Sequence, residues 1–387
     1  MIPSIKLPEC KSIIIRQMII SFLTEGVVRE VLADDCSDVR VTAQALSAIL
    51  SAQGTEETII DVRDCGAAYR FLLPILSATP GSWLLTGTPR LLQRPIKPLV
   101  DVLQAAGADI RVQADGLHIR GHVMRAETIS IDCRHSSQYA SALLLSAPLT
   151  GLQRLYTEPA AMTSSSYVEL TRQCMPYWVE MPGRPFERKA IGLAGDWSAA
   201  LFWYAYALLH QQAFTLQNLS LDSLQSDAVI AQWFEALGIC SRQVGSDILI
   251  TPNGQRHTSP ITLDVRNNLD TVPVMCMLAT LMPLDILFLH THNLRYKESD
   301  RGRQLSEQLS SWTDITLTDD QLHVHGRDHC ANCLTGAPLK THHDHRLAMA
   351  FLLAARPEDL DDTDCLTKSY PMLVPQLRHV EKHPSEY

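Results

Sequence analysis

Hydrophobic and polar positions along the chain repeat one pattern, an amphipathic helix followed by two short strands. In residues 98–119, PLVDVLQAAGAD has apolar positions at helical spacing, and IRVQADGLHI alternates as strands do. Residues 227–250 and 301–324 repeat this order, and residues 167–191 form a looser copy. The predicted turns carry Ala-Asp-Gly, Gly-Ser-Asp and Thr-Asp-Asp, which suit hairpins.

One helix with two strands cannot bury its own apolar faces, so several copies must pack together. Their uneven spacing argues against a solenoid and favours an α/β architecture with helices gathered inside and sheets around them. A length of 387 residues predicts two large domains.

The composition is typical of a globular protein and leaves the predicted fold unchanged. The net charge, however, limits the kinds of ligand that the protein could bind. The chain is 46% hydrophobic and 19% charged, with a formal net charge of −9. No overall positive field would attract nucleic acid or an anionic membrane, so any anion site must be built locally. We predict no signal peptide and no membrane span, and therefore a cytoplasmic protein. No glycine-rich loop of the P-loop or dinucleotide type is present, so the sequence does not favour nucleotide chemistry.

Seven short segments combine a cation or hydroxyls with polar neighbours at predicted helix starts and turns. They are residues 11–16, 64–70, 86–95, 136–139, 293–301, 344–346 and 367–371. Lys, Arg and Ser beside a helix N-terminus suit phosphate and carboxylate groups. Taken alone, a helix cap or a solvated face explains six of these segments equally well or better. For residues 293–301, which lie between a predicted strand and a helix start, a cleft is at least as good an explanation.

Histidines and cysteines also gather near the C-terminus. His323, His325, His329, Cys330 and Cys333 lie close together, and His342, His343 and His345 follow. A Cys-x-x-Cys beside histidines can bind zinc, but a single such pair with this histidine spacing fits no standard finger. We therefore expect a surface turn here, and no metal.

In order and separation, the seven segments resemble the 5-enolpyruvylshikimate-3-phosphate synthase family of enolpyruvyl transferases, from residue 11 to about residue 380. The resemblance implies an inside-out α/β fold of two similar domains, each with three βαβαββ-like repeats around buried helices. The implied domains are residues 1–12 with 195–387, and residues 13–194, with the active site in the cleft between them. The chain would be a monomer.

The resemblance also implies a reaction. The 5-hydroxyl of shikimate 3-phosphate adds to C2 of phosphoenolpyruvate while C3 is protonated, and phosphate leaves the tetrahedral adduct. No metal or organic cofactor is needed, because the electrophile is already in the substrate. The protein must supply charge neutralisation, alignment and proton transfer.

Position by position, the resemblance assigns roles to residues of this chain. Asp270 takes the proton of the 5-hydroxyl, and Glu298 protonates the methylene carbon with help from Lys11. Phosphoenolpyruvate is held by Lys11, Gly66, Arg94, Gln138, Arg301, Arg346 and Lys368. Shikimate 3-phosphate is held by Ser12, Arg16, Ser136, Ser137, Ser164, Tyr167, Asp270, Asn293 and Lys297.

Several positions depart from the family pattern. Asp64-Cys65-Gly66-Ala67 stands where the family has Asn-Ala/Ser-Gly-Thr, so an acid replaces an amide and a hydroxyl is missing. Ile14 replaces the second Ser of Lys-Ser-x-Ser, and residues 164–167 lack the usual Lys-Pro. These changes leave open whether the Gly66 loop binds an anion.

Two other functions remain possible on the sequence. The related transferase acting on UDP-N-acetylglucosamine shares the fold, but it has Lys-Asn near its start and a Cys-bearing loop before Arg-Pro. Here Lys11-Ser12 and the Cys-free TGTPRLLQRP favour the shikimate enzyme. The altered Gly66 loop motivates the second alternative, a catalytically weakened homologue that only binds phosphorylated anions. Retention of Lys11, Asp270 and Glu298 argues against it.

Overall fold

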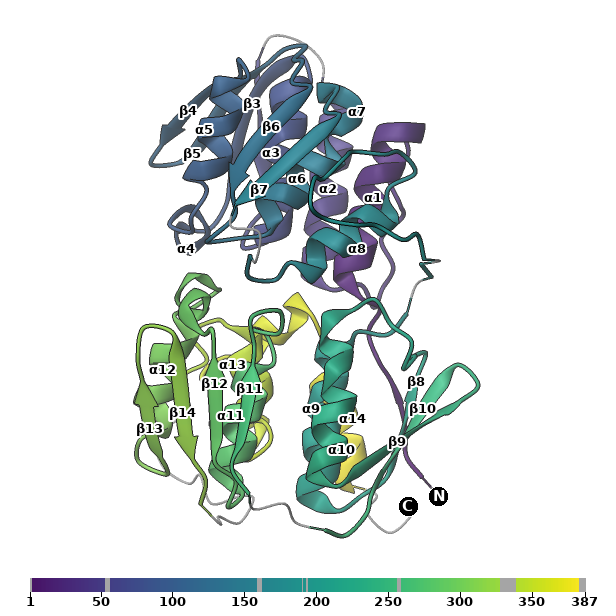
Figure 1. The fold of residues 1–387 in the computed structure, drawn as a ribbon, viewed down its shortest axis with the longest axis vertical. Coiled ribbons are helices and arrows are strands. Elements are labelled where there is room, and N and C mark those ends of the chain that lie inside the picture. The colour runs from purple at the N-terminus through teal and green to yellow at the C-terminus, as the bar shows by residue number, and fades with distance from the viewer. Residues whose placement is uncertain are drawn as a thin grey trace. The chain divides into compact units, whose positions relative to one another are not determined.

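The computed structural model describes residues 2–52, 56–158, 162–189, 191–192, 194–255, 259–327 and 339–382. The chain divides into two compact units (Figure 1). Unit 1 comprises Met1–Cys10 and Leu193–Tyr387, and unit 2 comprises Lys11–Gly192.

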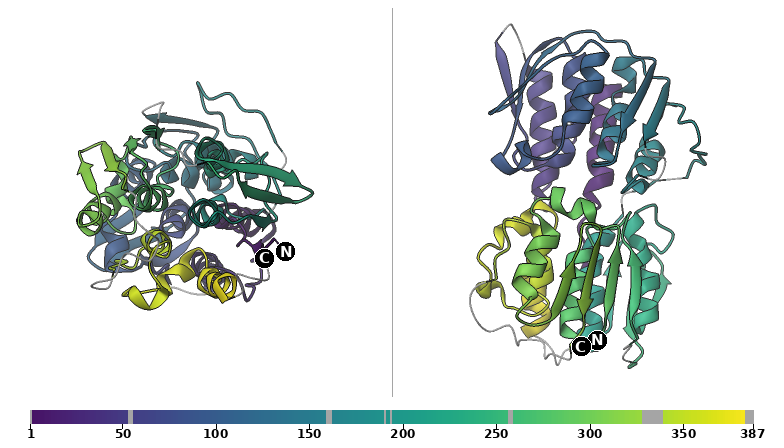
Figure 2. Two further views of the ribbon diagram at one scale, coloured as in Figure 1. Left: turned by 90° about the horizontal axis from the view of Figure 1, so that it is seen from below. Right: turned by 60° about the vertical axis from the view of Figure 1, so that its left-hand side comes forward.

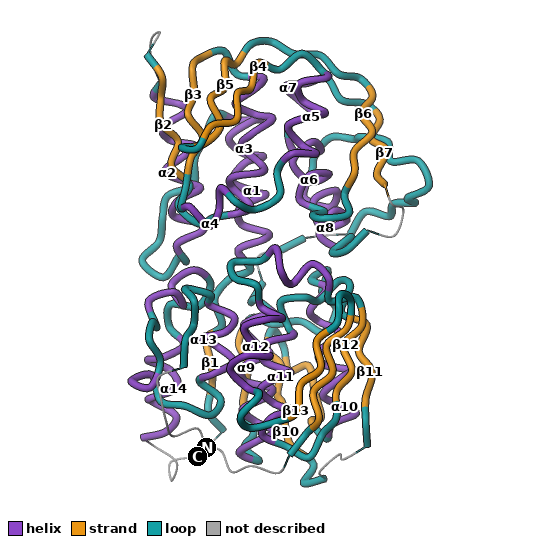
Figure 3. The backbone as a smooth tube through the Cα atoms, turned by 90° about the vertical axis from the view of Figure 1, so that its left-hand side faces the viewer, coloured by secondary structure: helices purple, strands orange, loops and turns teal. Residues whose placement is uncertain are grey.

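Unit 1 contains two four-stranded mixed sheets. The first has the order β1-β8-β10-β9 and comprises β1 (Ser4–Lys6), β8 (Phe214–Gln217), β9 (Ile239–Val244) and β10 (Asp247–Pro252). The second has the order β11-β12-β14-β13 and comprises β11 (Ile261–Asp264), β12 (Ile286–Leu289), β13 (Asp314–Leu317) and β14 (Gln321–His325). The strands of the second sheet lie side by side in Figure 3.

Helices of unit 1 connect and cover these sheets. They are α9 (Trp197–His210), α10 (Ile230–Leu237), α11 (Val272–Leu281), α12 (Arg301–Leu309), α13 (His345–Phe351) and α14 (Leu373–Lys382). Short 3₁₀ turns are η1 (Ser226–Val229), η2 (His292–Tyr296), η3 (Pro357–Asp359) and η4 (Asp364–Lys368).

Unit 2 has one four-stranded sheet and one parallel strand pair. The sheet has the order β2-β3-β5-β4 and comprises β2 (Glu57–Asp61), β3 (Gly81–Thr86), β4 (Asp109–Gln113) and β5 (Gly116–Gly121), while β6 (Thr128–Asp132) pairs with β7 (Arg154–Glu158). The helices are α1 (Lys11–Glu25), α2 (Ser37–Ser51), α3 (Gly66–Ala78), α4 (Pro89–Leu92), α5 (Lys97–Ala105), α6 (Gln138–Leu145), α7 (Ala147–Thr150) and α8 (Ser166–Cys174).

All three four-stranded sheets share one topology. A parallel pair, such as β2 with β3, continues into an antiparallel hairpin, here β5 with β4. The pairs β1 with β8 and β11 with β12 continue in the same way. This shared strand topology explains why the helix–strand–strand pattern recurs along the sequence.

The most apolar helices lie inside each unit, against the strands (Figure 2). All of α11 is buried, and α9 and α3 are buried except at single positions or at their ends. A helix that is apolar on all sides must be enclosed by other elements. In unit 1, the indole of Trp203 donates a hydrogen bond to the buried Tyr370 hydroxyl at 2.9 Å, which satisfies both polar groups in the core.

The sequence-based expectation of an α/β protein is confirmed. Helix–strand–strand segments occur in residues 98–119, 227–250 and 301–324 as predicted. The looser copy in residues 167–191 is wrong, because α8 is followed there by loops and one isolated bridge, Arg154 with Glu180, in the described residues. No helix in the described part of the chain is long and apolar enough to cross a membrane.

Candidate active site

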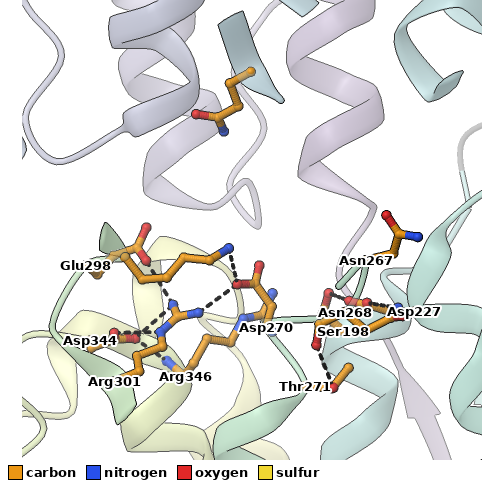
Figure 4. A network of polar contacts seen from close by, with 12 residues as sticks. Ser198, Asp227, Asn267, Asn268, Asp270, Thr271, Glu298, Arg301, Asp344 and Arg346 are labelled. Atoms are coloured by element: carbon orange, nitrogen blue, oxygen red, sulfur yellow. Dashed lines mark hydrogen bonds and ion pairs between the residues drawn. The ribbon is translucent and has the colours of Figure 1, made fainter. Parts of the chain in front are cut away.

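Three helix N-termini of unit 1 bring six charged side chains together. Asp270 directly precedes Thr271, the N-cap of α11, Arg301 opens α12, and Asp344 caps α13. Lys297, Glu298 and Arg346 belong to the same group, and we call these six residues the unit 1 cluster (Figure 4). Helix N-termini carry partial positive charge, which favours carboxylates at these positions.

Arg301 lies at the centre of the unit 1 cluster, with 1% of its side chain exposed. Its Nε and Nη2 donate to Asp344 at 2.8 and 3.1 Å. Its Nη1 donates to Asp270 at 2.6 Å, and its Nη2 also donates to Glu298 at 2.8 Å. The three carboxylates raise the pKa of Arg301 further above its ordinary value although burial opposes them. The guanidinium therefore fixes both predicted catalytic carboxylates.

Asp270 also accepts a hydrogen bond from Lys297 Nζ at 2.9 Å. Burial by itself would raise the pKa of Asp270, and Glu298 adds to that effect. Lys297, Arg301 and Arg346 outweigh both and hold the pKa of Asp270 well below its usual range. Asp270 is therefore ionised at neutral pH and can accept a proton.

Arg346 differs from Arg301 in its partners. It is 2% exposed, and its Nη1 contacts Met349 Sδ at 3.6 Å. Its Nε has no hydrogen-bond partner in the residues that the structure describes. A buried guanidinium without its full set of partners is costly, and an anion that supplied the missing acceptors would offset that cost.

A buried polar network holds the segment that carries Asp270. Asp227 accepts hydrogen bonds from Ser198 Oγ and from Asn268 Nδ2, the latter at 2.9 Å. The Asn268 carbonyl accepts in turn from the backbone and hydroxyl of Thr271, at 3.0 and 2.7 Å. Burial is the main cause that raises the pKa of Asp227. Sequence reasoning missed this network, because Ser198, Asp227 and Asn268 meet only after folding.

The other predicted residues of unit 1 lie on short elements near these helices. Asn293 is buried in η2, and Lys368 is buried at the end of η4, which packs against α13. Asp344 was not among the predicted site residues. Its position as the N-cap of α13, just before Arg346, was the available signal.

In unit 2, Gly66 opens α3 beside two arginines. A Cβ atom at Gly66 would lie 2.7 Å from Arg94 Nη1 and 3.0 Å from Arg70 Nη1, so glycine permits both guanidiniums to approach the start of the helix. Arg70 Nη1 donates to Gln138 Oε1 at 2.8 Å. We call Gly66, Arg70, Arg94 and Gln138 the unit 2 cluster. Arg70 is the cation of the predicted segment 64–70, but it was not assigned a site role from the sequence.

The departure from the family pattern before Gly66 has a structural role. Cys65 is buried and serves as the N-cap of α3, where its sulfur accepts from the backbone N–H of Ala68 at 3.4 Å. A Cys can thus replace the usual small residue at this cap, and both arginines still reach the helix start.

Lys11 and Arg16 lie on α1 and have protein partners. Lys11 Nζ pairs with Asp38 of α2 at 2.8 Å. The buried guanidinium of Arg16 donates to Thr171 Oγ1 at 2.7 Å and to the carbonyls of Ser12 and Tyr167 at 2.7 and 3.2 Å. Arg16 therefore joins α1 to α8, and its predicted substrate contact stays a prediction.

The remaining predicted residues of unit 2 lie at the starts of α6 and α8. Ser136 Oγ accepts from the Gln138 backbone N–H at 3.2 Å, and Ser137 is buried. Ser164 precedes α8 with φ at 60°, which is uncommon for a residue with a side chain. His329, Cys330 and Cys333 of the predicted surface turn lie outside the described residues.

Comparisons with known proteins identify the family of this chain. The family model of EPSP synthase (3-phosphoshikimate 1-carboxyvinyltransferase) matches residues 3–377. A 3-phosphoshikimate 1-carboxyvinyltransferase of Bacteroides fragilis is 32% identical, with 97% of this chain and 94% of that protein covered. One from Dehalococcoides mccartyi is 26% identical, with 95% and 93% covered.

Solved structures show the same fold. EPSP synthase from Acinetobacter baumannii matches with a TM-score of 0.66 and 19% identity, covering 98% of this chain and 97% of that one. The enolpyruvyl transferase NikO from Streptomyces tendae matches with a TM-score of 0.65 and 15% identity, covering 97% and 94%. The resemblance found in the sequence is confirmed, and the chain belongs to the EPSP synthase family of 3-phosphoshikimate 1-carboxyvinyltransferases.

Proposed function

We propose that this protein transfers the enolpyruvyl group of phosphoenolpyruvate to the 5-hydroxyl of shikimate 3-phosphate and releases phosphate, as a step of aromatic amino acid biosynthesis. Membership of the family supports this activity. The observation that carries it in this chain is the unit 1 cluster, where one buried arginine holds two carboxylates suited to proton transfer.

Asp270 acts as the base in this proposal. Its low pKa keeps it ionised but makes it a weak proton acceptor, because Lys297, Arg301 and Arg346 hold that pKa down. Anionic substrates that bind these cations would weaken their effect on Asp270 and raise its pKa. The carboxylate would then take the 5-hydroxyl proton as the oxygen attacks C2.

Glu298 acts as the acid. Its Oε2 is held by Arg301 Nη2 at 2.8 Å, and 15% of its side chain is exposed. In the proposed step the Glu298 proton passes to C3 of phosphoenolpyruvate as the carbon–oxygen bond forms at C2. When phosphate leaves the tetrahedral adduct, the ionised Glu298 takes a proton back from C3 and the double bond is restored.

Anion binding falls to residues of both units. Arg346 and Lys368 in unit 1 are buried cations suited to the phosphate and carboxylate of phosphoenolpyruvate. Arg94 and Gln138 in unit 2 would contribute to the same substrate, and Arg70 would position Gln138 through its 2.8 Å hydrogen bond. Lys11 would assist Glu298 after exchanging its contact with Asp38.

We propose that shikimate 3-phosphate is held by the residues that the family resemblance indicated. They are Ser12, Arg16, Ser136, Ser137, Ser164, Tyr167, Asp270, Asn293 and Lys297. Ser137 and Asn293 are buried, so a ligand that contacts their polar groups would be largely shielded from solvent.

The finer architecture is proposed on the same basis. We propose three βαβαββ-like repeats in each domain; among the described residues, two four-stranded sheets of unit 1 and one of unit 2 have the strand pattern of such a repeat. A monomeric state and a cytoplasmic location stay predictions.

Release of phosphate from phosphoenolpyruvate in the presence of shikimate 3-phosphate tests the proposal. A binding-only homologue, motivated by the altered Gly66 loop, would bind both substrates and release no phosphate at saturation. UDP-N-acetylglucosamine in place of shikimate 3-phosphate should give no turnover.

A further inference from the structure

Two histidines and an aspartate gather on one face of the second sheet of unit 1, outside the clusters described above. His323 and His325 are alternate residues of β14, so both side chains point to the same face. Asp285 directly precedes β12, and the register of Ile286 with Val324 places it opposite His325. In the described residues these three are the one group whose ligand atoms all lie within 4.8 Å of one another.

The spacing of His325 and Asp285 fits joint coordination of a metal ion. His325 Nδ1 lies 3.4 Å from Asp285 Oδ2, which is long for a hydrogen bond. Two ligands of a tetrahedral zinc ion, each bonded at about 2.0–2.1 Å, lie about 3.4 Å apart. The rings of His323 and His325 have centroids 3.9 Å apart, so small rotations of these half-exposed side chains would complete a three-ligand site.

The surrounding backbone holds the donors in place. Asp285 Oδ1 accepts a hydrogen bond from the Gly326 N–H at 2.9 Å, which orients the carboxylate and leaves Oδ2 toward His325. Gly326 itself packs tightly, because a Cβ atom there would lie 2.1 Å from the backbone nitrogen of Leu284. Contacts of this kind orient ligands in metal sites.

The types of donor atom indicate which class of metal would bind. Imidazole nitrogens with one carboxylate favour zinc and similar divalent transition metals over calcium or magnesium.

We propose that Asp285, His323 and His325 bind a divalent transition-metal ion of the zinc type, with water completing its coordination. The site lies at the start of β12, whereas Asn293 and Glu298 follow the end of that strand. A bound ion would link the start of β12 to the end of β14. It has no part in the proposed transfer reaction. From the sequence, His323 and His325 were considered as zinc ligands and no metal was expected; Asp285, which lies 40 residues before His325, was not part of that group.

Calorimetric titration of the full chain with zinc chloride, after dialysis against a chelator, tests this site. The measurements use a Cys330→Ser, Cys333→Ser background, which removes as competing donors two thiols that follow β14 in the sequence. We expect one equivalent of zinc to bind, and no binding in this background would overturn the proposal. Asp285→Asn, His323→Gln and His325→Gln should each weaken binding at least about tenfold, since altering even an outer contact costs 10–100-fold.

Two controls separate loss of ligands from loss of fold. Asp285→Asn keeps an oxygen to accept from Gly326, so its circular dichroism should match that of the parent protein. His118→Gln removes a histidine that contacts Glu57 and Asp115 on the sheet of unit 2, and it should leave zinc affinity unchanged. Unchanged affinity in His325→Gln would overturn the proposal.

Cobalt(II) provides an independent readout in the chain with all its cysteines. We expect visible bands of a nitrogen- and oxygen-ligated ion that disappear in His325→Gln. A thiolate-to-cobalt charge-transfer band that persists in His325→Gln would assign the metal to the cysteines and overturn the proposal.

Discussion

Arg301 and Asp344 form a two-point ion pair, with Nε to Oδ2 at 2.8 Å and Nη2 to Oδ1 at 3.1 Å, and both side chains are buried. This pair fixes the guanidinium plane while Nη1 and Nη2 hold Asp270 and Glu298. Asp344 therefore acts on the proposed catalytic carboxylates through Arg301.

Asp344→Asn should lower both stability and turnover. Removing one partner of a buried ion pair costs about 3–5 kcal/mol, because the other charge stays buried. Urea denaturation would measure the free energy of unfolding, and steady-state kinetics would measure kcat. Asp300→Asn is the matched control, because Asp300 caps α12 through Arg303 N–H at 3.3 Å. Equal stability losses in the two variants would contradict the role of Asp344.

Glu298→Gln should lose turnover while keeping its fold. An amide can still accept from Arg301 Nη2, but it cannot donate a proton to carbon, and general acid catalysis contributes about 10²–10⁴-fold. The phosphate-release rate and the thermal midpoint would be measured together. Glu307→Gln alters a similar pair with Arg303, at 2.6 Å on the exposed surface, and should keep its activity. Near-normal kcat in Glu298→Gln would remove Glu298 from the mechanism.

Gly66→Ala should raise the KM for phosphoenolpyruvate without destabilising the protein. The new Cβ atom would lie 2.7 Å from Arg94 Nη1, and the flexible guanidinium can move away from it. Alanine also favours the helix by up to about 1 kcal/mol. Kinetics with each substrate varied would show the effect, with the KM for shikimate 3-phosphate as the internal reference. A fall in thermal midpoint with unchanged KM values would refute this reading of Gly66.

Arg94→Ala should weaken phosphoenolpyruvate binding more than shikimate 3-phosphate binding, because its guanidinium lies at the start of α3 beside Gly66. Arg90→Ala, at an exposed position of α4, is the matched control and should change neither constant. Separate binding titrations with the two substrates would measure the difference. Equal losses for both would overturn the placement of Arg94.

The lowered pKa of Asp270 predicts how the free energy of unfolding changes with pH. Because its folded pKa lies well below its unfolded value of about 3.9, its stabilising effect is present above that pH. The effect is lost as pH falls below about 4 toward the folded pKa. The difference in unfolding free energy between wild type and Asp270→Asn should therefore shrink between pH 5 and the most acidic pH at which both fold. A constant difference would show that Asp270 is not held ionised by its neighbours.

The sequence predicted local order better than the contacts between distant segments. The helix–strand–strand pattern of residues 98–119 follows from periodicity alone, whereas residues 167–191 show similar spacing without forming a strand pair in the described residues. Chain order located Glu298 and Arg301, which are three residues apart in the sequence. It could not show that Arg301 meets Asp344, 43 residues away, or that Arg70 meets Gln138, 68 residues away.

We propose that the unit 1 cluster performs enolpyruvyl transfer. The most direct test is phosphate release by the purified full chain with saturating phosphoenolpyruvate and shikimate 3-phosphate, compared with Glu298→Gln. We predict release that requires both substrates, forms the enolpyruvyl product in equal amount and falls at least about 10²-fold in the variant. Binding of both substrates by the wild-type chain with no phosphate released would contradict the account.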